Sequence, residues 1–338
     1  MDEIIPKVDI DKIKAELTPE KLLRKTNKAG NEIYVFTHHD APNTMLEVAR
    51  LREIAFRSHG GGTGNSIDID EFDTMENPYK QLIVWDPDSD EILGGYRFLC
   101  GTDVKLDDRE QPILATSHLF NFSPKFVKKY LPKTVELGRS FVSLEYQATK
   151  TLSKKGLFVL DNLWDGLGAL PVIDPSLRYY FGKVTMYNTY NVEARNMILY
   201  FINHYFPDHE KLVRPVHPLV THTDYDKMSQ LFTGKDYKLD YKTLNLEVRK
   251  FGINIPPLVS GYMNLSPMMK VFGTAVNHEF GEVEETGILI DVNEIFEEKK
   301  KRHIESFLRE KPSRKILKRI RALISRRYAK ENGSAAWL

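Results

Sequence analysis

Three charged residues interrupt apolar stretches of the sequence and are the first candidates for chemistry. Glu136 and Arg139 lie within residues 135–144, and Arg97 lies within residues 94–99 after two glycines. A buried carboxylate can take the proton of an attacking amine, and a guanidinium can bind a carboxylate or a phosphate. We therefore treat Glu136 and Arg139 as candidate catalytic residues and Arg97 as a candidate substrate-binding residue. For a lone Glu/Arg pair, a structural salt bridge is the more common explanation.

An acidic cluster follows a glycine-rich segment. Residues 59–65 contain four glycines, which predicts a mobile loop, and they lack the Gly-Lys-Ser/Thr ending of a nucleoside triphosphate loop. Residues 68–73 then carry Asp68, Asp70 and Asp73. Such a run is most often a solvated loop or the cap of a helix.

The remaining pattern predicts the elements that must hold these residues. Strands are expected at 33–37, 134–146, 181–187, 218–221 and 287–292, and residues 81–85 and 92–99 form a hairpin. Helices are expected from Thr44, with Glu47 at capping-box spacing, over residues 156–170, and after Asn191. This order predicts an α/β fold in which a mixed sheet has helices on both faces.

Composition excludes several classes of protein. The chain has 338 residues and a net charge of +1, so no overall field attracts nucleic acid. The single cysteine, Cys100, rules out a disulfide framework and fits a buried strand. His38, His39, His217 and His222 lack the paired spacing of a metal site, so we expect no metal. An acidic start and the absence of a long apolar run predict a cytoplasmic protein without a membrane span.

The C-terminal segment is strongly basic. Residues 311–330 contain nine Lys or Arg and no Asp or Glu, and Ile316, Ile320, Leu323 and Ile324 fall on one helical face. A basic amphipathic helix binds an anionic membrane surface or an acidic protein. The same pattern fits equally well a terminal helix that packs on the body through its apolar stripe.

The order of these residues resembles two related enzyme families. Arg52, Phe56, the aspartates of residues 68–73, Arg97 and the Glu136-x-x-Arg139 motif together resemble acyl-homoserine-lactone synthases, which have the GNAT fold. Residues 136–142, 163–167, 180–185, 256–262 and 280–291 resemble more closely the hemolysin-like, ornithine-lipid type N-acyltransferases, and within them the bacterial glycine N-acyltransferases. The resemblance covers roughly residues 33–295. It implies a GNAT-like domain over 31–298, with a lead-in at 1–30 and a tail at 299–338.

The resemblance also implies a reaction. Enzymes of this family transfer a long, often 3-hydroxylated acyl chain from acyl carrier protein to the α-amine of an amino acid, in aminolipid synthesis. By analogy Glu136 is the base, direct or through water, while Arg139 and Arg97 bind a substrate carboxylate or the donor phosphate. Arg52, Phe56, Asp70 and Asp73 would shape the amine site. Glycine is the expected acceptor; ornithine, second, would need a carboxylate such as Asp70 or Asp73 for its distal ammonium.

One segment departs from acetyl-CoA-dependent GNAT enzymes. Those enzymes bind pyrophosphate through a glycine-rich loop at a helix N-terminus, and residues 147–156 lack that glycine pattern. A phosphopantetheine thioester on acyl carrier protein has one phosphate, so the departure fits this donor, with no permanently bound cofactor. Lys150, Lys154 and Lys155 are candidate contacts to that phosphate or to the carrier, although each alone fits a solvated turn.

Two other functions remain open from the sequence. An acetyl-CoA-dependent acetyltransferase is disfavoured by the missing glycines, and acetyl-CoA binding would restore it. A membrane-associated binding protein with the same fold and no catalysis would retain its function after Glu136→Ala and lose it on deletion of residues 311–338.

Overall fold

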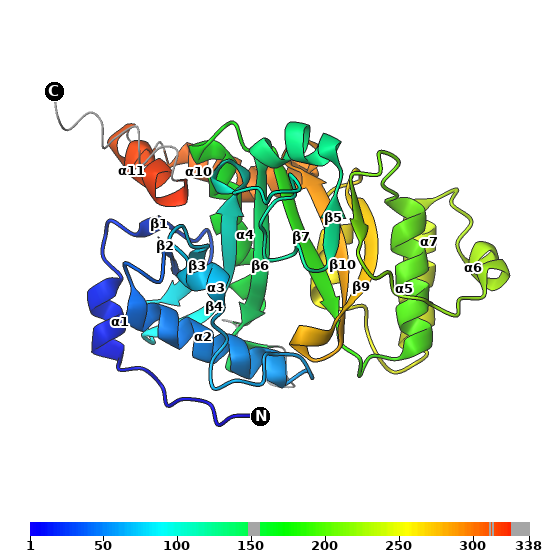
Figure 1. Cartoon of the computed structure of the whole chain (residues 1–338), viewed down its shortest axis with the longest axis horizontal. Coiled ribbons are helices and arrows are strands. Elements are labelled where there is room, and N and C mark those ends of the chain that lie inside the picture. The colour runs from blue at the N-terminus through cyan, green and yellow to red at the C-terminus, as the bar shows by residue number, and fades with distance from the viewer. Residues whose placement is uncertain (148–155, 311, 313, 326–338) are drawn as a thin grey trace.

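A computed structural model of the chain describes residues 1–147, 156–310, 312 and 314–325 (Figure 1). An eight-stranded sheet forms its centre, with the order β1-β2-β3-β4-β6-β7-β10-β9. The strands of this sheet are β1 (Leu22–Lys25), β2 (Glu32–Phe36), β3 (Lys80–Asp86), β4 (Glu91–Cys100), β6 (Thr134–Val142), β7 (Tyr179–Met186), β9 (Lys270–Asn277) and β10 (Val283–Asp291). β5 (Phe120–Phe122) and β8 (Val213–Pro215) pair separately. The predicted mixed sheet is confirmed.

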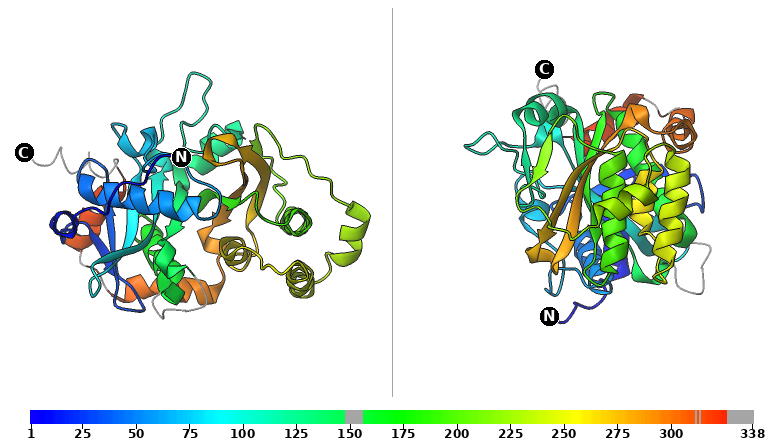
Figure 2. Two further views of the ribbon diagram at one scale, coloured as in Figure 1. Left: turned by 90° about the horizontal axis from the view of Figure 1, so that it is seen from below. Right: turned by 90° about the vertical axis from the view of Figure 1, so that its right-hand side faces the viewer.

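Helices cover both faces of this sheet (Figure 2). α4 packs on one face against alternate residues of β3 and β4 such as Leu82 and Leu93, while α2 packs on the other face against Ile83 and Trp85. The alternation follows from the period of two in a strand. The helices are α1 (Ile10–Glu16), α2 (Pro42–Arg57), α3 (Glu71–Thr74), α4 (Gly156–Ile173), α5 (Val192–Tyr205), α6 (Tyr225–Leu231), α7 (Tyr237–Arg249), α8 (Pro257–Met263), α9 (Glu297–His303), α10 (Glu305–Arg309) and α11 (Arg314–Ile324).

Strands β6 and β7 run parallel to each other and separate partway along their length. Pairing runs from Thr134 opposite Tyr179 to Leu137 opposite Gly182, although β6 continues to Val142 and β7 to Met186. Beyond Leu137, β6 continues its pairing with β4 on the other side. The sheet therefore opens between β6 and β7, immediately after Glu136 and Leu137.

The start of α2 differs from the prediction. The prediction of a capping box at Thr44 and Glu47 is wrong, because α2 already begins at Pro42. The carboxylate of Glu16 instead accepts hydrogen bonds from the backbone N–H groups of Asn43 and Thr44, at 3.0 and 2.7 Å. A residue of α1 thus caps α2, which a local spacing rule does not detect.

We expect Glu16→Ala to lower the free energy of unfolding by about 1 kcal/mol, because helix caps typically contribute this amount. Urea denaturation followed by circular dichroism measures the change. Lys12→Ala is the matched control, since Lys12 is exposed on the same helix. Equal effects of the two substitutions would contradict a capping role for Glu16.

The C-terminal segments pack on the body. The Nδ1 of His303 lies 2.8 Å from the Oδ1 of Asp165 in α4. On α11, Ile320 and Ile324 are buried in the main core, and the Sγ of Cys100 donates to the backbone oxygen of Ile324 at 3.2 Å. Ile316 is exposed. Part of the predicted apolar stripe therefore faces the protein, and Cys100 is the buried strand residue that its surroundings predicted.

No helix in the described part of the chain is long and apolar enough to cross a membrane.

Two strands differ from their predictions. The strand expected at 218–221 is wrong, because Pro218 makes only an isolated bridge to Ala275. The strand expected to reach residue 146 ends at Val142, and a short 3₁₀ turn follows.

Candidate active site

A cavity of about 780 Å³ lies where β6 and β7 separate. Glu136, Gly138 and Arg139 of β6 and Lys183 of β7 line it. Its other walls come from residues 63–72, from the segment 107–122 after β4, and from residues 277–280. Ligand sites commonly have volumes of about 300–1,000 Å³. The cavity can therefore hold a small acceptor together with part of a larger donor.

Glu136 is buried at the wall of this cavity, where its hydrogen bonds connect it to the segment that contains Ala115 and Thr116. One carboxylate oxygen accepts from the hydroxyl of Thr116 at 2.6 Å, and the other accepts from the hydroxyl of Tyr79. The Tyr79 hydroxyl accepts in turn from the backbone N–H of Ala115 at 2.9 Å. Burial raises the pKa of Glu136 above its ordinary value, against the hydrogen bonds from Thr116 and Tyr79. A carboxylate of this kind is a stronger base than an exposed one.

The predicted arginines and aspartates meet in one network beside the cavity. Arg52 contacts Asp68 through Nε at 3.1 Å and Asp73 through Nη2 at 2.9 Å. Arg97 contacts Asp70 and Asp73 through Nη1 at 2.7 and 3.1 Å. The same aspartates anchor the third guanidinium: the Nε of Arg139 lies 2.9 Å from Asp68. Three guanidinium groups and three carboxylates therefore balance one another.

The acidic cluster is both a helix cap and part of this network. Asp70 caps α3, and its carboxylate accepts from the N–H of Asp73, while the Asp73 carboxylate accepts from the N–H of Asp70. Burial would raise the pKa of Asp68, yet Arg139 and Arg52 hold it below its ordinary value. The neighbouring guanidinium groups thus favour the ionised form of Asp68.

Arg139 adopts an unusual backbone conformation. Its φ is 47°, in the left-handed region that residues with side chains seldom occupy. Gly95 pairs with Phe141 and Arg97 pairs with Gly138, so Arg139 and Ser140 form a β-bulge. The Arg139 guanidinium lies 4.4 Å from the ring centroid of Phe280. The bulge directs this side chain toward the cavity and the network.

The structure brings together some of the predicted site residues and separates others from the cavity. Glu136, Arg139, Asp70 and Arg97 line the cavity. Arg52, Asp73 and Phe56 do not: the first two complete the ion network behind its wall, and Phe56 packs against Phe280 at 5.2 Å between ring centroids. Lys150, Lys154 and Lys155 lie outside the described residues.

The sequence reasoning missed several residues of the cavity wall. Lys183 forms an ion pair with the buried Glu285, which also accepts from Thr185 at 2.8 Å and from Asn277 at 3.3 Å. A charged residue within the apolar run of β7 was a usable signal for Lys183. His118 also lines the cavity, and burial lowers its pKa. Nothing in its sequence surroundings distinguishes His118.

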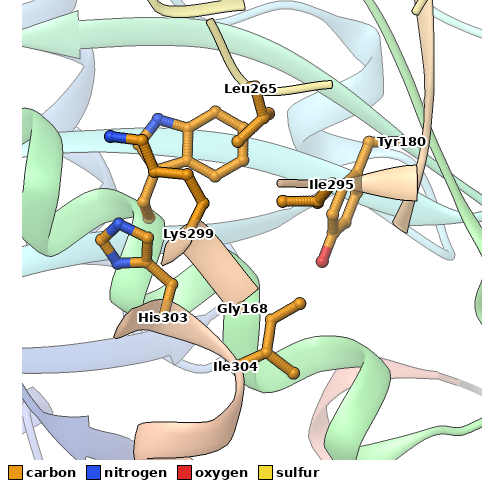
Figure 3. A pocket seen from close by; sticks show the side chains of 8 residues that line it. Gly168, Tyr180, Leu265, Ile295, Lys299, His303 and Ile304 are labelled. Atoms are coloured by element: carbon orange, nitrogen blue, oxygen red, sulfur yellow. The ribbon is translucent and has the colours of Figure 1, made fainter. Parts of the chain in front are cut away.

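A second pocket, on the α4 side of the sheet, is too small for a substrate (Figure 3). Its volume is about 10 Å³, enough for roughly one water molecule. The residues that line it include Tyr180, Leu265, Ile295, Lys299, His303 and Ile304. Within the described ranges, no group of three or more His, Cys, Asp or Glu side chains is arranged to hold a metal ion.

Comparison with known proteins identifies the family of the chain. Residues 51–155 match the acetyltransferase (GNAT) domain family. The chain is 61% identical over 312 residues to the glycine N(alpha)-acyltransferase of Bacteroides thetaiotaomicron, covering 92% of each chain. It is also 61% identical to the glycine N(alpha)-acyltransferase of Phocaeicola vulgatus, covering 92% of this chain and 95% of that one. A likeness at this identity and coverage establishes both fold and catalytic class: the chain is an acyltransferase that belongs to the glycine N-acyltransferase family within the GNAT superfamily.

Proposed function

We propose that the enzyme transfers a 3-hydroxylated fatty acyl group from the phosphopantetheine thioester of acyl carrier protein to the α-amine of glycine, in aminolipid synthesis. The observation that carries the choice of glycine is the 61% identity, over 92% of the chain, to two relatives named as glycine N(alpha)-acyltransferases. The product would be an N-acylated glycine, a lyso-lipid that a second acyltransferase completes. Ornithine is the second candidate acceptor.

The shape of the cavity supports a donor on an extended arm. Since the sheet opens between β6 and β7, a thioester can reach Glu136 between the two strands. The wall also carries apolar residues suited to an acyl chain, among them Leu114, Phe120, Phe122 and Leu137. The absence of the pyrophosphate-loop glycines at residues 147–156 supports a carrier-bound donor over acetyl-CoA. We retain Lys150, Lys154 and Lys155 as proposed contacts to this donor, which leaves no permanently bound cofactor.

We propose that Glu136 takes the proton from the amine, directly or through water. The amine nitrogen attacks the thioester carbon, the carbon–sulfur bond breaks, and the thiolate leaves and is protonated. The amine must lose one proton in this sequence, and a buried carboxylate with a raised pKa is suited to accept it near neutral pH. We propose that Arg97 and Arg139 bind substrate anions, while Arg52, Phe56, Asp70 and Asp73 keep the acceptor side in place.

We propose that the enzyme is cytoplasmic and that its product enters a membrane. We propose that residues 311–330 contact the anionic inner membrane surface. Because Ile320 and Ile324 are buried against the body, we propose that exposed cations such as Arg314 and Lys318 make the contact with the membrane. Each basic residue near such a surface contributes about 1 kcal/mol. An acidic carrier protein is the competing occupant of this surface.

The test supplies the purified protein with 3-hydroxyacyl carrier protein and either glycine or ornithine, and detects the N-acyl product by mass spectrometry. We expect N-acylglycine as the main product and little product with ornithine. Acetyl-CoA replaces the carrier-bound donor in a parallel reaction, where we expect no measurable transfer. Absence of product with every amino acid, or acetyl transfer at a comparable rate, contradicts the proposal. Glu136→Gln serves as the inactive control protein.

A further inference from the structure

Lys183 is a partly buried cation at the cavity that has donors to spare. It is the first residue of β7 beyond the β6–β7 pairing, which ends where Leu137 lies opposite Gly182. Its side chain is 14% exposed and lines the cavity. A lysine ammonium has three N–H donors, and within the part of the chain that the structure describes only Glu285 accepts from it. The remaining donors are available to a ligand in the cavity.

Glu285 holds the Lys183 ammonium in place. Glu285 is fully buried, and its carboxylate also accepts from Thr185 at 2.8 Å and from Asn277 at 3.3 Å. Lys183 pairs with Gly287, two residues from Glu285, so the two charged side chains share one face of the sheet. Burial lowers the pKa of the Lys183 ammonium, against this ion pair. A second carboxylate beside the ammonium would favour its charged form.

Lys183 lies across the opening of the sheet from Glu136. Glu136 pairs with Phe181, two residues before Lys183, so both charged side chains project from the same face. Strands at pairing distance place such Cα atoms about 8 Å apart. The Nζ of Lys183 also lies 5.8 Å from the ring centroid of Phe280, a ring that the Arg139 guanidinium contacts from β6. A small molecule between the two strands can therefore meet Glu136 and Lys183 at the same time.

We propose that the Lys183 ammonium binds the carboxylate of the amino acid acceptor and places the acceptor amine beside Glu136. The inference rests on the proposed function and names a specificity-determining residue within it. In that reaction the acceptor carboxylate is the one stable anionic group of the two substrates near the reacting carbon. The donor phosphate lies at the far end of the phosphopantetheine arm, and the acyl chain is apolar. A fixed cation beside the base therefore selects an acceptor whose carboxylate adjoins its amine.

Lys183→Met tests the proposal, because it removes the ammonium and keeps a side chain of similar length. We expect the KM for glycine to rise by about 10- to 100-fold, since a hydrogen bond to a charged group is lost, while the KM for the acyl carrier protein donor stays unchanged. The ratio of kcat/KM for glycine to that for glycinamide, which lacks the carboxylate, should fall by a similar factor. Arg109→Met is the matched control, because Arg109 is an exposed cation that also lines the cavity, and it should change this ratio far less.

A double variant separates binding from folding, because Lys183→Met alone leaves Glu285 buried without its cation. Lys183→Met combined with Glu285→Gln removes both charges together. An amide at position 285 can still bond to Thr185 and Asn277. This variant, checked for folding by circular dichroism, should show the same loss of preference for glycine over glycinamide.

Four results would overturn the assignment. A double variant with the wild-type KM for glycine would show that Lys183 serves only its ion pair. Equal losses of kcat with glycine and glycinamide would place the ammonium at the thioester oxygen, and a rise in the donor KM alone would place it at the donor. An equal effect of Arg109→Met would indicate a general requirement for positive charge. Activity of the wild-type enzyme with glycine is measured first, and its absence contradicts the proposed function itself, so the two failures are distinguishable.

Discussion

Glu136→Gln is expected to lower kcat by about 10²- to 10⁴-fold, the range that loss of a general base produces. The substitution removes the proton acceptor and retains the shape of the side chain. Thr116 and Tyr79 are hydroxyls that can either donate or accept, so both can still bond to an amide at position 136. The loss should therefore appear in the rate of the chemical step and leave the fold unchanged, as single-turnover kinetics and urea denaturation would measure.

The pH dependence of kcat gives an independent check on the same residue. A base acts only when it is ionised, so the rate should rise with pH through the pKa of Glu136 and then level off. Burial raises that pKa, which places the rise above the usual range of carboxyl groups. The rise should disappear in Glu136→Gln. A rise at the same pH in both proteins would assign it to another group.

Glu279→Gln is the matched control, because Glu279 is an exposed carboxylate that also lines the cavity. It should lower kcat far less than Glu136→Gln. Comparable losses in both variants would indicate that the cavity requires negative charge in general and contains no single base.

The sequence predicted the fold best where the pattern is local. The hairpin of β3 and β4, the helix capped by Asn191 and the strand β7 are each confirmed within a few residues, since each depends on side-chain periodicity and turn chemistry. The cap of α2 by Glu16 was missed because its two members come from different helices. Strand β9 was missed as well, and its pairing with β10 is a tertiary property.

For the candidate site, the sequence identified unusual residues and could not arrange them. Charges within apolar runs marked Arg97, Glu136 and Arg139, all of which line the cavity. Whether a guanidinium faces substrate or a buried aspartate depends on strand register and on a bulge, and neither is readable from spacing. Lys183 shows the same signal as Arg97 and was overlooked. The partner of Lys183, Glu285, is reached only through the pairing of β7 with β10.

The position of Arg52 leads to the second large effect, this time on stability. Arg52 is fully buried and contacts Asp68, Asp73 and Gln81, the last at 3.2 Å from Nη1. Arg52→Leu removes the cation and leaves the two carboxylates buried with fewer partners. Breaking a buried ion pair in this way costs about 3–5 kcal/mol, which urea or thermal denaturation would measure. Lys14→Ala, which breaks an exposed pair with Asp90, should lower the stability far less.

The effect of Arg52→Leu should also depend on pH. The pKa of Asp68 in the folded protein lies below its ordinary value, so this group stabilises the fold above the unfolded pKa of about 3.9. That stabilisation is lost as the pH falls through the folded pKa of Asp68. A protonated Asp68 has no charge to pair, so the absence of the Arg52 guanidinium then destabilises the fold less. The difference in unfolding free energy between wild type and variant should therefore be largest above about pH 4 and shrink in acid. A stable variant with an altered KM for glycine would instead place Arg52 in contact with the substrate, and the network would then be part of the binding site itself.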